Sequence, residues 1–298
     1  MKTDIAGILA PIATPFDDRE ELDIPRLKEN LARWSATRLT GVVVLGSNGE
    51  NVLLDADERE RLIAVVRENF PPDRRVLAGT GSESTRETIR LTRRAAECGA
   101  DAALVLNPSH YKGAMTGEAL RGFYLDVAEA SPIPIILYNM PRNTGVDLPA
   151  SLIIGLSSHP NIVGVKDSGG NIVQIAETIG CAAPGFAVFA GSAGFLLPTV
   201  LLGGVGGILA LANVVPDRCF EILSLVQAGR LEEARLLQVR LIPLNGAVTT
   251  RWGVAGLKAA LDLTGYYGGR PRRPLVPLGD QEREQLRGML EKVGALTG

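Results

Sequence analysis

Short apolar runs alternate with longer amphipathic stretches along most of the chain. Most runs begin or end in glycine, proline or asparagine, and they have the length of strands, whereas the stretches between them repeat apolar residues at helical spacing. The runs are GILAPIATP, GVVVLG, RVLAGTG, DAALVLN, PIILYN, IVGVK, AVFAG and GGILALAN. This alternation predicts parallel strands joined by crossover helices, and eight such units predict a closed (β/α)8 barrel.

Helical patterns fill the intervals and continue beyond the eighth unit. Asp57 and Thr116 are expected to cap two of the helices, because a side-chain oxygen at a helix start can accept a free backbone N–H. The sequence therefore predicts an α/β TIM barrel over 1–229 with a small helical C-terminal extension over 230–298. The expected helices are 25–38, 57–69, 84–98, 116–130, 149–158, 170–180, 194–203 and 217–228, then 231–244, 253–264 and 280–293.

Composition narrows the class of partner. The chain has 298 residues, 46% of them hydrophobic, and a formal net charge of −2, so nothing attracts it globally to nucleic acid or to an anionic membrane. The basic run RPRRP at 270–274 lacks interleaved aromatic residues and is predicted to be a surface loop rather than a nucleic-acid patch. Small molecules are the expected partners.

Cysteine usage and the first residues of the chain favour a cytoplasmic protein. Cys98, Cys181 and Cys219 lie far apart without CxxC spacing, which predicts neither a disulfide framework nor a thiolate metal site. The start, MKTDIAGILAPIATPF, carries an acid and reaches proline too early for a signal peptide. No later apolar run has the ~18 residues of a transmembrane helix.

Polar residues at the ends of the predicted strands are the first candidates for chemistry, because barrel enzymes place their active sites there. Lys166 ends IVGVK and faces the barrel interior if Ile162 and Gly164 do. Desolvation there lowers the proton affinity of the amine and exposes a neutral nucleophile. The alternative is a structural lysine paired with Asp167 or Glu50, and the pattern alone leaves both open.

Tyr138 ends the preceding predicted strand and could share a site with Lys166, because neighbouring strands lie about 4.8 Å apart. A phenol beside an imine can relay protons, although it could also simply pack at the barrel rim. The turn GSNGE after the second strand supplies Ser47, Asn48 and backbone amides that suit a carboxylate. Thr14, Tyr111 and Ser192 complete the polar strand ends. The turn AGTGSEST is better explained as a helix capped by Ser82 or Ser84.

Two other chemistries fit the sequence poorly. AGSAG around Ser192 has the relaxed form of a hydrolase nucleophile elbow, but such an enzyme needs a later histidine and none follows Ser192. The only histidines are His110 and His159, too few for a metal-dependent aldolase built on several imidazoles. His110 is expected in a polar loop and His159 at a helix C-terminus.

GSNGE, YNMPRNTG and GVKDSGG occur in that order on the predicted second, fifth and sixth strands. Together they resemble the dihydrodipicolinate synthase and N-acetylneuraminate lyase superfamily of class I aldolases, over nearly the whole chain. The resemblance implies a homotetrameric barrel, often a dimer of dimers, without metal or organic cofactor. It matches Lys166 to the Schiff-base lysine and Tyr138 to the catalytic tyrosine.

The same resemblance implies further site residues. Ser47 matches the hydroxyl relay, and Ser47 and Asn48 lie in the loop that binds the 2-oxo acid carboxylate. Tyr111 resembles the tyrosine that reaches into the partner's site, and Gly191 and Ile208 match positions that line the pyruvyl pocket.

Departures within the motifs bear on the substrate. Synthases usually show GTTGE and an arginine where this chain has Asn143, so their carboxylate clamp is missing unless Arg142 substitutes. HPNIVGVKDSGG, AGSAGF, ALANV and GYYGG resemble 4-hydroxy-2-oxoglutarate aldolase, which implies cleavage to pyruvate and glyoxylate, with Ser168 contacting the distal part of the substrate. His110 stands where that group often has tyrosine. The alternatives are dihydrodipicolinate synthesis, cleavage of a 2-keto-3-deoxy sugar acid, or a non-catalytic keto-acid-binding barrel.

Overall fold

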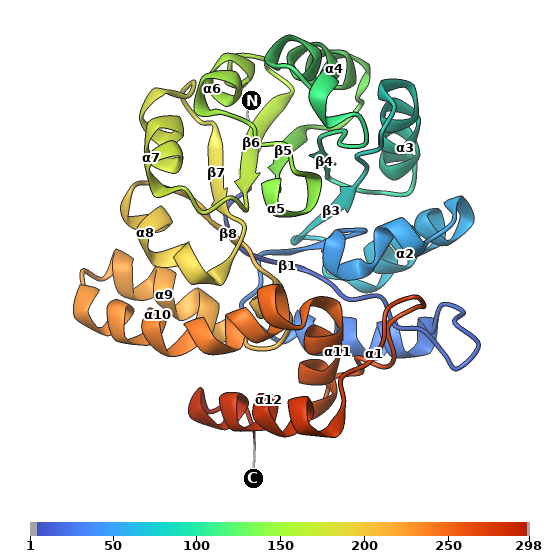
Figure 1. Cartoon of the computed structure of the whole chain (residues 1–298), viewed down its shortest axis with the longest axis vertical. Coiled ribbons are helices and arrows are strands. Elements are labelled where there is room, and N and C mark those ends of the chain that lie inside the picture. The colour runs from blue at the N-terminus through green and yellow to red at the C-terminus, as the bar shows by residue number, and fades with distance from the viewer. Residues whose placement is uncertain (1–4, 297–298) are drawn as a thin grey trace.

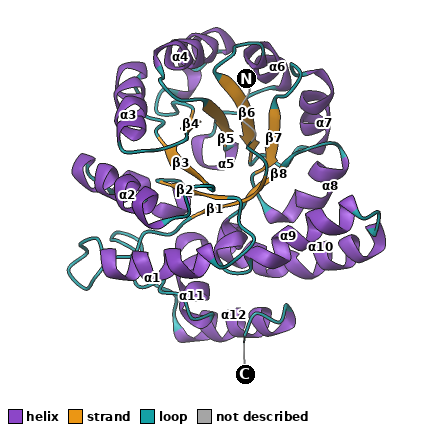
Figure 2. Ribbon diagram, turned by 180° about the vertical axis from the view of Figure 1, so that it is seen from behind, coloured by secondary structure: helices purple, strands orange, loops and turns teal. Residues whose placement is uncertain are grey.

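The centre of the protein is a closed barrel of parallel strands (Figures 1 and 2). The computed structural model describes residues 5–296, and within them each strand pairs with its neighbours in sequence while β8 closes on β1. The predicted (β/α)8 barrel is confirmed. Its strands are β1 (Gly7–Pro11), β2 (Gly41–Val44), β3 (Arg75–Gly79), β4 (Ala102–Leu106), β5 (Ile135–Asn139), β6 (Ile162–Asp167), β7 (Ala187–Ala190) and β8 (Gly206–Ile208).

Helices surround the barrel and extend from one side of it, as Figure 1 shows. Every predicted helix is present within a few residues of its expected ends, and a short helix, α5, is added after β5. The helices are α1 (Ile24–Ser35), α2 (Ala56–Asn69), α3 (Thr85–Glu97), α4 (Gly117–Ala130), α5 (Pro141–Thr144), α6 (Ala150–Ser157), α7 (Ile172–Cys181), α8 (Leu196–Leu201), α9 (Pro216–Gln227), α10 (Leu231–Gly246), α11 (Gly253–Leu263) and α12 (Asp280–Lys292).

Two of the predicted helix caps are confirmed, and the predicted cap at Asp57 is wrong. The Thr116 side chain accepts from Ala119 N and Ser84 caps α3, as predicted. Asp57, however, lies in the first turn of α2, and Asp55 is the cap. Asp55 accepts from Glu58 N while Glu58 accepts from Asp55 N, at 2.8 and 3.0 Å. This reciprocal capping box satisfies two free backbone amides. The helix therefore begins after Asp55 rather than at Asp57.

The inward and outward positions of β6 differ from simple alternation. The pairing of β5 with β6 steps from Ile135↔Ile162 to Ile136↔Gly164, so an extra residue, Val163, interrupts the alternation. Ile162 therefore packs in the cluster that faces the helices, whereas Val163 joins the barrel interior. Lys166 pairs with Tyr138, which lies in the barrel interior. Lys166 therefore faces inward as predicted, although Ile162 does not.

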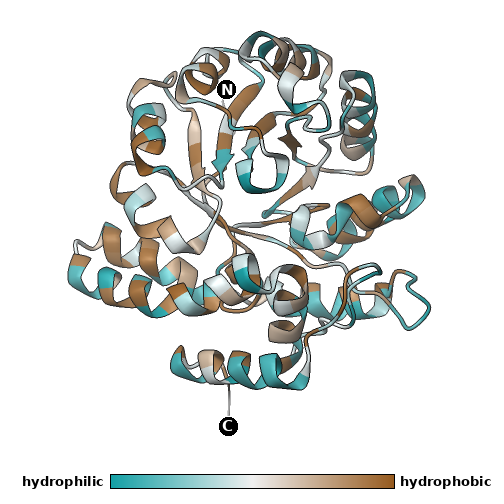
Figure 3. Cartoon of the chain, in the orientation of Figure 1, coloured by the Kyte–Doolittle hydropathy of each residue, from teal (hydrophilic) through white to brown (hydrophobic). Residues whose placement is uncertain are grey.

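The C-terminal helices share the core of the barrel side they cover. Leu241 of α10, Leu257 of α11 and Leu286 of α12 are buried in the same hydrophobic cluster as Ile8 and Trp34. Figure 3 shows brown, apolar stretches on α10, whereas α12 is mostly polar. Within residues 5–296, no helix is long and apolar enough to cross a membrane.

Candidate active site

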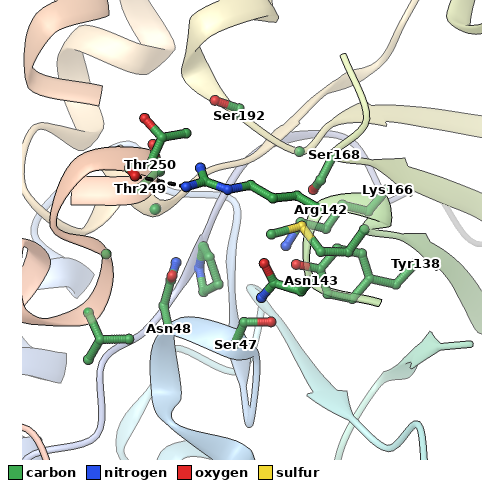
Figure 4. Close-up of a pocket in the computed structure, with 16 residues that line it drawn as sticks. Ser47, Asn48, Tyr138, Arg142, Asn143, Lys166, Ser168, Ser192, Thr249 and Thr250 are labelled. Carbon is green, nitrogen blue, oxygen red and sulfur yellow. Dashed lines mark hydrogen bonds between the residues drawn. The ribbon is translucent and has the colours of Figure 1, made fainter. Parts of the chain in front are cut away.

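A pocket opens at the carboxyl ends of the strands and gathers residues from far apart in the chain (Figure 4). It lies where barrel enzymes place their active sites. Nine of the residues singled out in the sequence line it: Ser47, Asn48, Tyr138, Arg142, Asn143, Lys166, Ser168, Gly191 and Ser192. The other lining residues are Pro11, Met140, Ala210, Thr249, Thr250, Gly253 and Val254.

Lys166 is buried at the end of β6 with its amine against an aromatic ring. Its exposed fraction is 4%, and Nζ lies 4.0 Å from the centroid of the Tyr138 ring on the adjacent strand. Among the described residues, no carboxylate lies within 4.0 Å of this amine. Asp167 accepts instead from Asn139 Nδ2 and Gly169 N, and Glu50 contacts Lys258 at 2.7 Å. The paired alternative for Lys166 is therefore wrong.

The Tyr138 phenol is prepared for proton transfer by its neighbours. Burial raises its pKa, but the Lys166 charge and side-chain hydrogen bonds with Ser47, Lys166 and Ser168 outweigh burial, so the pKa lies below that of free tyrosine. A hydroxyl that interacts with an amine and two serines can exchange protons with each of them. Figure 4 shows the phenol beside the Lys166 amine.

The GSNGE turn after β2 is held in place by a hydrogen bond from Thr14. Ser47–Gly49 form a short 3-10 turn, whose first amides have no partner inside the turn and can face a bound anion. Thr14 lies beyond the end of β1 rather than within it, and its hydroxyl donates to Gly49 O at 2.7 Å. Glu50, with a φ of 57°, turns the chain away. Thr14 thus supports the turn and does not line the pocket.

Gly191 permits two chain segments to meet at the pocket wall. Its amide donates to Asp167 O at 2.6 Å, and a Cβ at this position would lie 2.0 Å from Ser168 Oγ and 2.5 Å from Asp167 O. A side chain here would displace Ser168 from the pocket. The small residue is therefore required where the loops after β6 and β7 touch.

Two predicted site residues lie outside this pocket. Ile208 is fully buried in the barrel interior, in the cluster that includes Tyr138, and does not line the cavity. Tyr111 is 73% exposed, and its ring meets His110 edge to face at 4.9 Å. Within its own chain, Tyr111 does not reach Lys166.

The C-terminal segment forms a wall of the pocket that sequence reasoning missed. Thr249, Thr250, Gly253 and Val254 line it, around the junction of a π-helical turn at Ala247–Arg251 with α11. Arg142 of α5 donates from Nη2 to Thr250 O at 2.8 Å. No local pattern identified these residues, because only the packing of α10 and α11 brings them to the strand ends.

Ser192 has a structural partner. Its hydroxyl caps the following turn at Gly194 N and accepts from Asn245 Nδ2 at 3.0 Å, so it joins the loop after β7 to α10. Among residues 5–296, no group of three or more His, Cys, Asp or Glu side chains is arranged to hold a metal ion.

Residues 4–293 match the model of the dihydrodipicolinate synthetase family. The chain belongs to this family. It is 38% identical over 95% of its length to a probable mitochondrial 4-hydroxy-2-oxoglutarate aldolase of Emericella nidulans, 93% of which is covered. It is 37% identical to a 4-hydroxy-tetrahydrodipicolinate synthase of Methanothrix thermoacetophila, with 98% of both chains covered.

Solved structures of the family agree in fold. A dihydrodipicolinate synthase of Bacillus anthracis superposes with a TM-score of 0.93 at 30% identity, covering 97% of this chain and 98% of the other. Membership and these relatives together make the protein a carbon–carbon lyase of the class I aldolase type.

Proposed function

We propose that the protein cleaves 4-hydroxy-2-oxoglutarate to pyruvate and glyoxylate through a Schiff base on Lys166. The observation that carries the proposal is a buried strand-end amine, without a carboxylate partner among the described residues, 4.0 Å from the ring of Tyr138. A buried amine without a counter-ion suits attack on a ketone.

Imine formation uses the residues around the amine. The unprotonated Nζ of Lys166 adds to the C2 carbonyl, and the resulting carbinolamine loses water as Tyr138 and Ser47 pass protons to the leaving hydroxyl. Ser47 and Asn48, with the first amides of their turn, hold the C1 carboxylate and so fix which carbon faces the amine.

Cleavage then uses the iminium as an electron sink. The C4 hydroxyl loses its proton, the C3–C4 bond breaks, and its electron pair forms an enamine while C4 becomes the aldehyde of glyoxylate. The enamine takes a proton at C3, and water hydrolyses the pyruvate imine and frees Lys166. One water is released and one consumed, so the reaction balances as a simple cleavage.

The aldolase of Emericella nidulans supports this substrate, as do Asn143 in place of the synthases' arginine and the presence of Ser168 in the pocket. Dihydrodipicolinate synthesis is the second candidate, and the 37% identity to the Methanothrix synthase favours it. Comparing pyruvate release from 4-hydroxy-2-oxoglutarate with pyruvate consumption in the presence of aspartate semialdehyde separates the two.

Reduction with borohydride in the presence of pyruvate tests the chemistry itself. The expected result is a pyruvate-derived mass increase on the peptide that contains Lys166, and its absence after Lys166→Ala. An adduct on another lysine, or no adduct, would overturn the proposed mechanism.

We also propose a homotetramer in which Tyr111 enters a partner subunit's pocket to join the proton relay. The support is that Tyr111 is 73% exposed in a single chain and lies outside its own pocket. Sedimentation analysis, together with activity recovered by mixing Tyr111→Phe and Lys166→Ala chains, tests both parts of this proposal.

A further inference from the structure

The pocket carries positive charge without any acidic residue. Its lining residues include Arg142, which is always charged, and Lys166, whose nitrogen becomes positively charged in the proposed iminium, and none of them is Asp or Glu. The nearby acids point elsewhere: Asp147 and Asp167 both accept from Asn139 Nδ2, at 2.7 and 2.9 Å. A cavity with a guanidinium, a nitrogen that becomes an iminium and no carboxylate of its own favours a ligand with more than one negative charge.

Arg142 supplies the guanidinium, and it has spare donors. It lies on α5, four residues after Tyr138, and its guanidinium extends across the pocket toward the C-terminal segment (Figure 4). Within the described residues, the Arg142 side chain makes one hydrogen bond, from Nη2 to Thr250 O. Among the described residues, no carboxylate lies within 4.0 Å of it. A guanidinium has five N–H donors in a planar fork, so most of them remain available for a carboxylate.

The contact with Thr250 also fixes where the fork lies. It holds this exposed side chain across the mouth of the pocket (Figure 4), which reduces the conformational freedom that a ligand would otherwise have to remove. Arg142 is therefore placed before a ligand arrives, on the side of the pocket formed by Thr249 and Thr250 rather than by Ser47 and Asn48.

We infer that Arg142 binds the distal carboxylate of the substrate and makes this active site selective for dianionic 2-oxo acids. The inference rests on the proposed function, because the imine at Lys166 and the C1 carboxylate at the GSNG turn orient the far end of the molecule toward Arg142. A hydroxylated sugar-acid tail would leave the guanidinium without an anion. Aspartate semialdehyde would bring a carboxylate for the guanidinium, but also an ammonium that meets no acidic group among the lining residues.

Two five-carbon ligands isolate this contact. 2-Oxoglutarate and 2-oxopentanoate share the 2-oxo acid end and differ at C5, which is a carboxylate in one and a methyl group in the other. Neither has a C4 hydroxyl, so neither can be cleaved, and borohydride trapping on Lys166 reports the concentration at which each half-saturates the site.

In the unmodified enzyme, 2-oxoglutarate should half-saturate at a concentration about 10- to 100-fold lower than 2-oxopentanoate, as one charge-assisted contact predicts. Arg142→Ala should reduce that preference to less than about 3-fold, and Arg142→Lys should keep part of it because the charge remains and the fork is lost. Arg240→Ala, which removes an exposed arginine of α10 outside the pocket, should change nothing.

An unchanged preference in Arg142→Ala, or none in the unmodified enzyme, would overturn the inference. Equal weakening of both ligands would also overturn it, since that would show a general loss of pocket structure. If pyruvate is not trapped on Lys166 at all, the imine mechanism has failed instead. Calorimetric titration of the same two ligands without borohydride then still decides the role of Arg142.

Discussion

Two lysines of the described chain, Lys166 and Lys258, are buried, and they differ in their partners. Lys166 and Lys258 are 4% and 1% exposed, and each amine lies over an aromatic ring, 4.0 Å from the centroid of Tyr138 and 4.5 Å from that of Phe16. Burial and an aromatic neighbour are therefore common to both and cannot by themselves make a lysine reactive.

The partners of Lys258 make it structural. Its Nζ contacts Glu50 Oε1 at 2.7 Å and donates to Arg270 O at 2.9 Å, while Glu50 accepts from Arg272 N at 2.8 Å. Burial lowers the pKa of Lys258, and the Glu50 charge opposes that shift. An amine held by a carboxylate and a carbonyl has no free electron pair to offer, whereas Lys166 faces an open pocket and a phenol. In the proposed mechanism, access to the pocket and the missing counter-ion distinguish Lys166 from Lys258.

The largest expected effect is at Lys166. Lys166→Ala should lower the rate of pyruvate release by at least about 10⁴-fold, because no other group can form the imine. Its urea unfolding midpoint should stay the same or rise, since a buried amine without a counter-ion is removed. A variant that unfolds more easily and retains activity would reverse the roles assigned to the two lysines.

Tyr138→Phe should lower kcat by about 10²- to 10⁴-fold, as the loss of a proton relay predicts, with little change in stability. The phenol must be protonated to donate, and its pKa is lowered, so activity should fall on the alkaline side at a pH below about 10. The alkaline limb of the pH–rate profile should disappear in the variant. A profile identical to that of the unmodified enzyme would exclude Tyr138 as the relay.

Lys258→Met should instead lower the free energy of unfolding by about 3–5 kcal/mol, because Glu50 would be left as an uncompensated buried charge. Adding Glu50→Gln should recover most of that loss by removing the charge. Urea unfolding of the two variants measures both steps. If the double variant is no more stable than Lys258→Met, the ion pair does not explain the burial of Lys258.

The smallest expected effect on stability is at the ion pair between Arg272 and Glu58. Arg272 donates to both Glu58 oxygens, and this hydrogen bond, opposed by burial, holds the pKa of Glu58 below its usual value. The contribution is present above the unfolded pKa of about 4.3 and is lost as pH falls through the lower folded pKa. Glu58→Gln should cost about 1 kcal/mol or less at pH 7 and flatten the acid side of the stability profile. Equilibrium unfolding at several pH values tests this.

The same network corrects the interpretation of RPRRP as a surface loop. Arg273 is exposed, but the Arg272 side chain is only 14% exposed and donates to Glu58 and to Leu53 O. Sequence spacing could not reveal this, because the partners of Arg272 lie more than two hundred residues earlier in the chain.

The sequence by itself determined the barrel and the strand-end position of its chemistry. Period-two and period-3.6 patterns are local, and parallel strands with crossover helices bring every strand end to one face, so Lys166, Tyr138 and the GSNGE turn had to converge there. The proposed division into a 1–229 barrel and a 230–298 extension follows the same pattern and stays a prediction.

Tertiary structure alone decided which lysine Glu50 would hold, which residue would interrupt the alternation in β6, and which distant segment would close the pocket. Val163, Lys258 and Thr250 take these places through packing between elements far apart in the chain. Such contacts depend on the closed shape of the whole barrel and its C-terminal helices. The periodicity of apolar residues along the chain is local and does not predict them.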